Sequence, residues 1–152
     1  MADAYNGKFI KQCTIDFFNA CAGKLKDTIH IQNKIIGIAG HSKLVSYIGH
    51  DGLMDFDLKI SFSNLDNKKR DCIILACVSK HYFAPYLEQT KAYPLVWTTG
   101  LMCPEAYTVH DAITGFINGE NAESCRSRAA LAYQSKHKCG IKGARNLLVT
   151  GW

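Results

Sequence analysis

A cysteine and a histidine each follow a short apolar stretch that is typical of a strand. Cys77 ends the run "DCIILAC", and His50 follows "LVSYI" within the segment "YIGHDG". A continuous apolar run between polar flanks is the pattern of a strand buried on both faces of a parallel sheet. If the two strands are parallel neighbours, both side chains leave the sheet at the same edge. A thiol beside an imidazole is a nucleophile beside a base, so this spacing predicts a Cys–His dyad.

Other residues offer alternatives to this pair. Cys77 itself has a structural interpretation, because a free cysteine is a common small filler of buried strands. Cys72 lies deeper in the same run and is expected to be core filler. His81 follows Cys77 by one helical turn and is an alternative base.

Glycines surround the histidine and suggest how a substrate could approach. Gly49 and Gly52 flank His50 and Asp51, and glycine allows close contact between backbone and substrate. Main-chain N–H groups after His50 and at Cys77 could then stabilise an oxyanion. We therefore expect Gly49, Asp51 and Gly52 to form the loop that binds the oxyanion.

Composition describes an ordinary globular chain. Its 152 residues suffice for one domain, with 47% hydrophobic and 20% charged residues. No apolar run approaches the length of a membrane span, and the N-terminus does not resemble a signal peptide. The seven cysteines, an odd number scattered along the chain, favour reduced thiols in a cytoplasmic protein. They include no CxxC pair, so no local zinc ribbon or thioredoxin-like redox site is expected. We expect no cofactor and no metal, although distant Cys and His residues could still assemble a zinc site.

The net charge of +5 is concentrated near the C-terminus. From residue 121 onward, six basic residues face a single acid, Glu123. Such a surface could bind nucleic acid, but it lacks the interleaved aromatic residues of single-strand binders. A solvated helix surface is the simpler interpretation, and we do not expect a nucleic-acid partner.

Periodicity and breaking residues predict the order of elements. Helices are expected near residues 8–22, 79–92, 104–119 and 121–138, with a short final helix and tail over 141–152. Strands are expected near 27–40, 44–48, 72–76 and 93–100. Residues 53–70 are expected to form a crossover with a short helix. Strands that alternate with helices predict an α/β fold, a three-layer sandwich with a mostly parallel sheet.

The order of these parts resembles the caspase-like cysteine peptidases, the caspase–hemoglobinase fold. The segment "YIGHDG" is similar to the histidine motif of legumain and of the GPI-transamidase catalytic subunit, and "LACVS" to their cysteine motif. The later segment "VWTTGLMCPEAYT" is similar to the stretch that lines their specificity pocket. The stretches "GHDGLMD" and "LLVTGW" also resemble bacterial proteins of unassigned function.

The resemblance implies a single caspase-like domain over residues 1–152 and a cysteine peptidase that forms a thioester acyl-enzyme on a peptide or protein substrate. It makes Cys77 the nucleophile and His50 the base. It implies that the pocket contains Thr98, Thr99, Glu105 and Tyr107.

The chain also departs from the family pattern. Asp51 stands where the family usually has glycine, the crossover from His50 to Cys77 is short, and the first strand of the fold is not evident. A caspase-like binding or scaffold module without catalysis, and a module that binds nucleic acid through the basic C-terminal helices, are therefore alternative functions.

Overall fold

A mixed, mostly parallel sheet of four strands forms the centre of the protein. In the computed structural model, which describes residues 1–152, the strands are β3 (Leu44–Ile48), β4 (Asp71–Leu75), β5 (Tyr93–Thr98) and β6 (Leu148–Val149). Their order in the sheet is β3-β4-β5-β6. The first three strands are parallel, and the short β6 is antiparallel to β5. The expected α/β class and mostly parallel sheet are confirmed, whereas β6 was not predicted.

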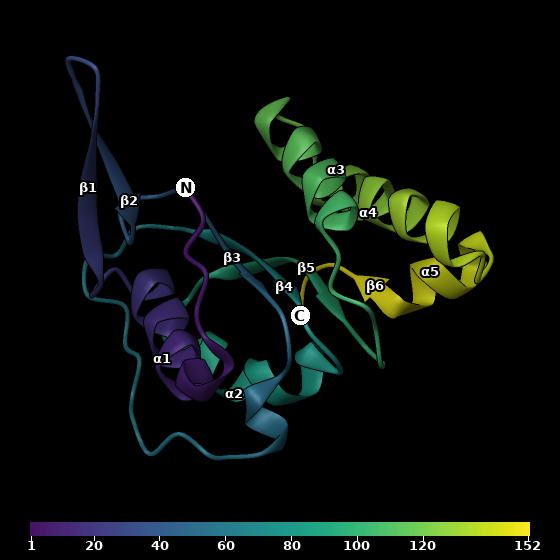
Figure 1. Cartoon of the computed structure of the whole chain (residues 1–152), viewed down its shortest axis with the longest axis horizontal. Helices are drawn as coiled ribbons and strands as arrows, with labels where there is room; N and C mark the ends of the chain where they lie inside the picture. Colours follow the sequence, from purple (N-terminus) through teal and green to yellow (C-terminus); the bar gives the residue numbers. More distant parts are fainter.

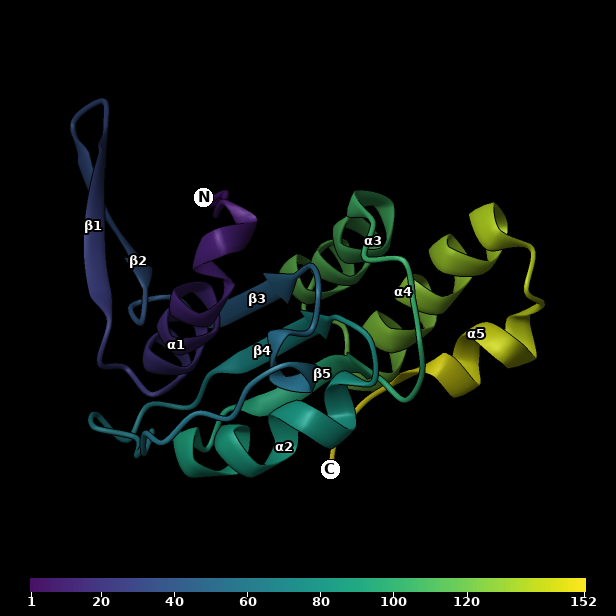
Figure 2. The ribbon, with the colours of Figure 1, turned by 60° about the horizontal axis from the view of Figure 1, so that its bottom comes forward.

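Helices cover both faces of this sheet (Figures 1 and 2). On one face, α1 (Ile10–Cys21) and α2 (Ser79–Thr90) enclose an aromatic core that includes Phe17, Phe18 and Phe83. On the other face, α3 (Ala106–Ile117) and α4 (Ala122–His137) pack on β4 and β5 through small residues such as Ala129 and Ala130. The helix α5 (Ile141–Leu147) leads into β6. None of these helices combines the length and the apolar character needed to cross a membrane.

Local sequence explains where the helices begin and end. Gly23 adopts φ +74°, a conformation that favours glycine, directly after α1. Asn121 caps α4, since its side chain accepts a hydrogen bond from the N–H of Ser124 at 2.9 Å. Pro104 lies two residues before α3 rather than inside its first turn.

A β-hairpin projects from the body beyond β3 (Figures 1 and 2). Its strands are β1 (Lys26–Ile31) and β2 (Lys34–Ala39), which pair antiparallel and form a separate two-stranded sheet. Gln32 adopts φ 52° in the turn between them. The extended segments predicted around residues 32 and 33 are therefore two strands of one hairpin.

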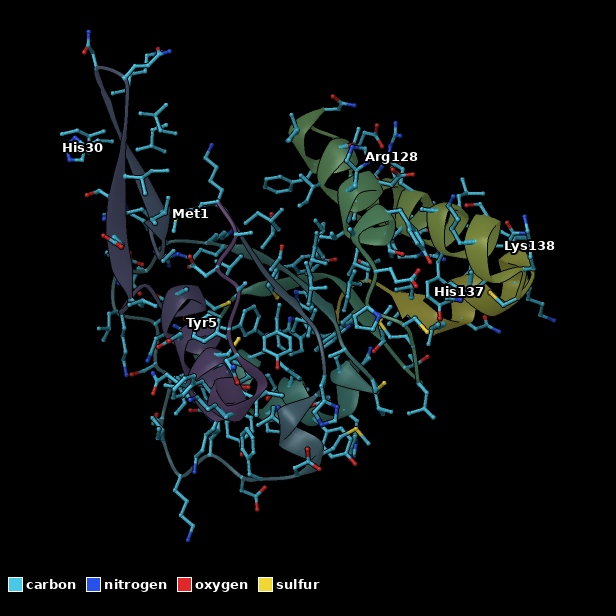
Figure 3. The ribbon with its side chains drawn as sticks, viewed as in Figure 1. Met1, Tyr5, His30, Arg128, His137 and Lys138 are labelled. Atoms are coloured by element: carbon cyan, nitrogen blue, oxygen red, sulfur yellow. The ribbon has the colours of Figure 1, made fainter.

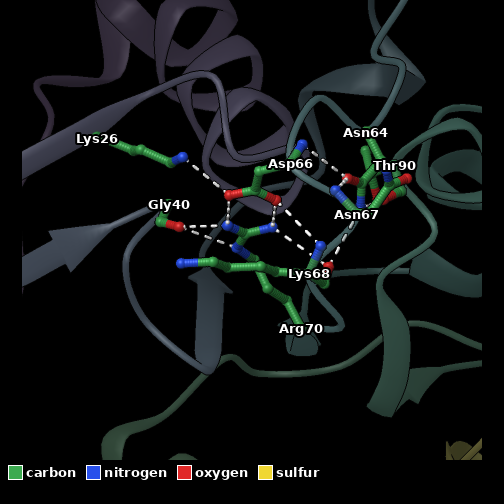
Figure 4. A network of polar contacts seen from close by, with 8 residues as sticks. All are labelled: Lys26, Gly40, Asn64, Asp66, Asn67, Lys68, Arg70 and Thr90. Atoms are coloured by element: carbon green, nitrogen blue, oxygen red, sulfur yellow. Dashed lines mark hydrogen bonds and ion pairs between the residues drawn. The ribbon is translucent and has the colours of Figure 1, made fainter.

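The crossover from β3 to β4 contains little regular structure. It begins with the 3-10 turn η2 (Gly52–Met54), and the expected short helix does not form beyond this single turn. The rest runs as irregular chain to Arg70, whose side chain is buried. The Arg70 guanidinium donates to the carbonyl of Gly40 and to the carboxylate of Asp66, which also pairs with Lys26 at 2.8 Å (Figure 4). These contacts fix the base of the hairpin to the crossover.

Candidate functional site

Parallel strands bring His50 and Cys77 to the same edge of the sheet. Ile48 and Leu75 are the last paired residues of β3 and β4, and the Gly49 N–H donates to the Leu75 carbonyl at 3.1 Å. His50 and Cys77 each lie two residues beyond that pair. The carboxyl edge of a parallel sheet is where α/β proteins place their sites.

The ring of His50 is held by a residue that the sequence analysis did not consider. Nε2 of His50 lies 2.7 Å from Oδ2 of Asp55, and both side chains are more than half exposed. The turn η2 lies between them and folds the chain back, so that the two side chains meet. This bond makes Nε2 the N–H donor and leaves Nδ1 as the basic nitrogen. No hydrogen bond joins His50 to Cys77 in this structure.

Cys77 occupies a sharp turn between β4 and α2. Val78 adopts φ 50° and ψ 30°, a left-handed conformation that is unusual for a β-branched residue. The Val78 N–H donates to the carbonyl of Gly100 at 2.9 Å, and the N–H of Met102 lies 3.5 Å from the Cys77 sulfur. The loop after β5 therefore packs against this turn and leaves the thiol half-buried.

Hydroxyl groups beneath the turn hold it in place. Ser79 and Thr98 are both buried, and their hydroxyl oxygens lie 3.0 Å apart. The Ser79 hydroxyl also donates to the carbonyl of Ile74, and the Thr98 hydroxyl donates to that of Ala76. Thr98 is consequently part of the support below Cys77 and does not line an open pocket, which corrects our expectation for this residue.

Two main-chain donors at the site are unused. The N–H groups of Cys77 and Asp51 donate no hydrogen bond within the protein. Asp51 is fully buried, so its N–H is not accessible from solvent, whereas the half-buried Cys77 has an unused N–H at this edge of the sheet.

Asp51 is turned into the protein and away from solvent. Its side chain is buried, and Oδ1 accepts a hydrogen bond from the N–H of Leu53 at 2.9 Å, which caps η2. Oδ2 has no hydrogen-bond partner. Burial raises the pKa of Asp51 to about 6. The Asp51 carboxylate thus stabilises the turn from inside the protein.

Gly49 and Gly52, which flank His50 and Asp51, have different structural roles. Gly49 adopts φ +154°, and a Cβ there would meet nothing within 4 Å. Gly52 is buried, and a Cβ there would come within 2.8 Å of the Phe56 ring. Gly52 therefore allows the close packing of η2, whereas Gly49 provides the backbone conformation before His50.

The remaining pocket residues fall into two groups. Thr99 is exposed and donates its hydroxyl hydrogen to the carbonyl of Asn146 at 2.7 Å. It lines an open cavity of about 600 Å³ beside the Cys77 turn, together with His81. The other cavity residues are Val78, Lys80, Ala84, Pro85 and Glu88.

Glu105 and Tyr107 both lie beside His137, a residue that the sequence did not single out. The Tyr107 hydroxyl lies 2.7 Å from Nε2 of His137, and the Glu105 carboxylate lies 3.4 Å from the same nitrogen. The His137 ring stacks on Tyr133 with centroids 4.1 Å apart. This cluster joins the start of α3 to the end of α4. Its polar contacts do not include Cys77.

Ion pairs occupy much of the basic C-terminal surface. Arg126 and Arg145 both bind the carboxylate of Glu123, and Arg128, labelled in Figure 3, pairs with Glu120 at 2.6 Å. The three arginines thus have partners within the protein.

No group of three or more His, Cys, Asp or Glu side chains is arranged to hold a metal ion. All seven cysteines are free thiols. Comparisons with protein-family models, with curated proteins and with solved structures found no match.

Proposed function

We propose that this protein is a caspase-like Cys–His hydrolase, and specifically a cysteine peptidase. The observation that carries the proposal is the placement of His50 and Cys77 two residues beyond the paired ends of neighbouring parallel strands. The unused N–H group of Cys77 supports it, because acyl transfer needs a donor for an oxyanion.

In the proposed reaction, Nδ1 of His50 takes the proton of the Cys77 thiol as sulfur attacks the peptide carbonyl. The negative charge passes to the carbonyl oxygen, which accepts a hydrogen bond from the N–H of Cys77. When the C–N bond breaks, His50 returns the proton to the leaving amine and a thioester remains on Cys77. Water, deprotonated by His50, then releases the acid and restores the thiol.

This reaction requires the His50 ring to turn toward Cys77, and its surroundings permit that. The side chain is 58% exposed, and its Asp55 partner is also on the surface. Catalytic hydrogen bonds in free enzymes are often formed only when substrate binds. Asp55 would then keep the ring in the tautomer whose Nδ1 is unprotonated.

A thiol-reactive peptide probe tests the proposal, with the cysteines of the chain as internal controls. Cys103 and Cys139 are exposed, whereas Cys77 is half-buried. Accessibility alone therefore favours labelling of Cys103 and Cys139. We expect mass spectrometry to find Cys77 labelled first, and His50→Gln to slow that labelling about 10²- to 10⁴-fold. If Cys103 and Cys139 are labelled before Cys77, and His50→Gln does not change the rate at Cys77, a binding module without catalysis is favoured.

Peptide hydrolysis is the second part of the test. Purified protein should release product from a mixed library of fluorogenic peptides, and Cys77→Ala should abolish the release. Cys72→Ala is the matched control, because it removes a thiol from the same strand run. Selective labelling of Cys77 without any peptide turnover would retain the dyad and reject the peptidase.

A further inference from the structure

The outer edge of β3 carries backbone groups without partners. The Lys43 carbonyl and the Gly49 N–H bond to β4, so the alternation of a parallel ladder also directs Val45 and Tyr47 toward β4. The N–H and C=O groups of Leu44, Ser46 and Ile48 consequently point away from the sheet. Because β3 ends the strand order, no strand of the same chain pairs with them.

A groove of about 540 Å³ runs along this edge. Helix α1 supplies Cys13, Phe17 and Ala20 to one wall, and helix α3 supplies Val109 and Ile113 to the other. Met1 and Tyr5, labelled in Figure 3, border the groove but make no hydrogen bond with β3. A strand that enters it would lie between two apolar layers and must be apolar on both faces.

Strand β2 has that composition, and its first four residues are exposed, whereas Ile38 and Ala39 line the groove of their own chain. It reads Lys-Ile-Ile-Gly-Ile-Ala, with one polar residue in six. The register of the hairpin places Ile36 and Ile38 on one face and Ile35 on the other. Ile35 is 68% exposed, and the outer edge of β2 is unpaired. An exposed apolar edge strand of this kind is a template for pairing with another chain.

The hairpin cannot fold back into its own groove without breaking contacts at its base. The Gly40 N–H donates to the Leu25 carbonyl at 2.7 Å, and the Gly40 carbonyl accepts from the buried Arg70 guanidinium (Figure 4). These bonds direct β2 away from the body. His30, labelled in Figure 3, lies on the projecting part.

Charge favours the same pairing. The charged residues of the groove are Asp3 and Asp16, both acidic. Lys34 is the one charged residue of β2, whereas Lys26 on β1 is already paired with Asp66 at 2.8 Å. A positive charge on β2 and an acidic groove on the same molecule are complementary between two copies.

We propose that two copies of this chain form a reciprocal dimer in which β2 of each copy pairs with the outer edge of β3 of the other. One twofold contact then covers both exposed features, as closed dimers do. The proposal does not depend on catalysis by Cys77.

Light scattering after size exclusion tests the dimer over a range of protein concentrations. We expect a mass of twice the 16.9 kDa chain that dissociates on dilution. Ile35→Lys places a charge on the apolar strand β2, and Ser46→Pro removes an outward N–H from the edge of β3. Each variant should therefore be monomeric. Leu131→Lys, at a residue 57% exposed on α4, is the matched control and should remain dimeric. Circular dichroism checks folding, and Ile48→Lys replaces Ser46→Pro if the proline variant does not fold.

Mixing the two variants separates this arrangement from other dimers. The Ile35→Lys protein keeps an intact groove, and the Ser46→Pro protein keeps an intact strand β2. One of the two contacts can therefore form between them, so the mixture should contain a weaker heterodimer. A wild-type chain that stays monomeric at all concentrations overturns the proposal. So does a dimer that survives both variants, or one that Leu131→Lys also dissociates.

Discussion

Nε2 of His50 lies 2.7 Å from Oδ2 of Asp55, across the 3-10 turn that Asp51 caps from within. Two carboxylates of one short loop thus have opposite surroundings. Asp55 is exposed and bound to the imidazole, whereas Asp51 is buried with one oxygen unpartnered. The contrast assigns them different roles, and each role leads to a measurement.

Replacement of Asp55 by Asn should slow probe labelling of Cys77 about two- to fivefold. The pair is largely exposed, and exposed ion pairs contribute about 0.2–1 kcal/mol. The rate of labelling at low salt, compared with wild type, measures the effect. The difference should shrink at high salt because surface charges are screened. Asp57→Asn, at an exposed carboxylate of the same crossover, is the control and should leave the rate unchanged.

Asp51 should make the protein less stable as the pH rises from about 4 to about 6. Burial raises the pKa of Asp51 to about 6, while an unfolded aspartate ionises near pH 3.9. In that window the folded protein holds a proton that the unfolded chain has lost, so the contribution of Asp51 to stability falls with rising pH. The full effect is at most about 3 kcal/mol.

Urea unfolding of wild type and Asp51→Asn at pH 4 and pH 7 checks this effect. The free energy of unfolding of Asp51→Asn, relative to that of wild type, should be higher at pH 7 than at pH 4. The amide keeps the acceptor for the Leu53 N–H and carries no charge at either pH. An equal difference at both pH values would show that Asp51 ionises normally in the folded protein.

Asp66 should show the opposite dependence on pH. The Arg70 guanidinium and then the Lys26 ammonium hold the pKa of the Asp66 carboxyl well below its usual range. Its contribution to stability is therefore present above about pH 4 and is lost as the pH falls further. Asp66→Asn should lower the Tm at pH 7 more than Lys26→Met does, because it leaves the buried Arg70 without its carboxylate. Equal Tm values for the two variants would mean that Arg70 does not depend on Asp66.

Val78 should be a source of backbone strain in the turn directly after Cys77. A left-handed conformation costs an L-residue about 1–2 kcal/mol, and glycine avoids that cost. We expect Val78→Gly to be more stable than Val78→Ala by about 1 kcal/mol in urea unfolding. A more stable alanine variant would indicate that the turn relaxes to another conformation.

The periodicity of the sequence was sufficient to predict most of the elements and the sheet edge at which His50 and Cys77 both lie. The apolar run before Cys77 and the stretch before His50 read as strands because buried strands need apolar side chains, and both strands are parallel neighbours. Asn121 and Gly23 marked helix ends because capping and positive φ restrict residue types. These are local requirements, so the sequence states them directly.

Only the tertiary structure decided the surroundings of each side chain. Asp55 reaches His50 because a 3-10 turn reverses the chain, and Thr98 lies beneath Cys77 because β5 packs beside β4. The structure also exposes much of the apolar strand β2, because Arg70 holds Gly40 and directs the hairpin outward. Contacts between residues far apart in the chain depend on how the elements pack, and no local pattern records that packing.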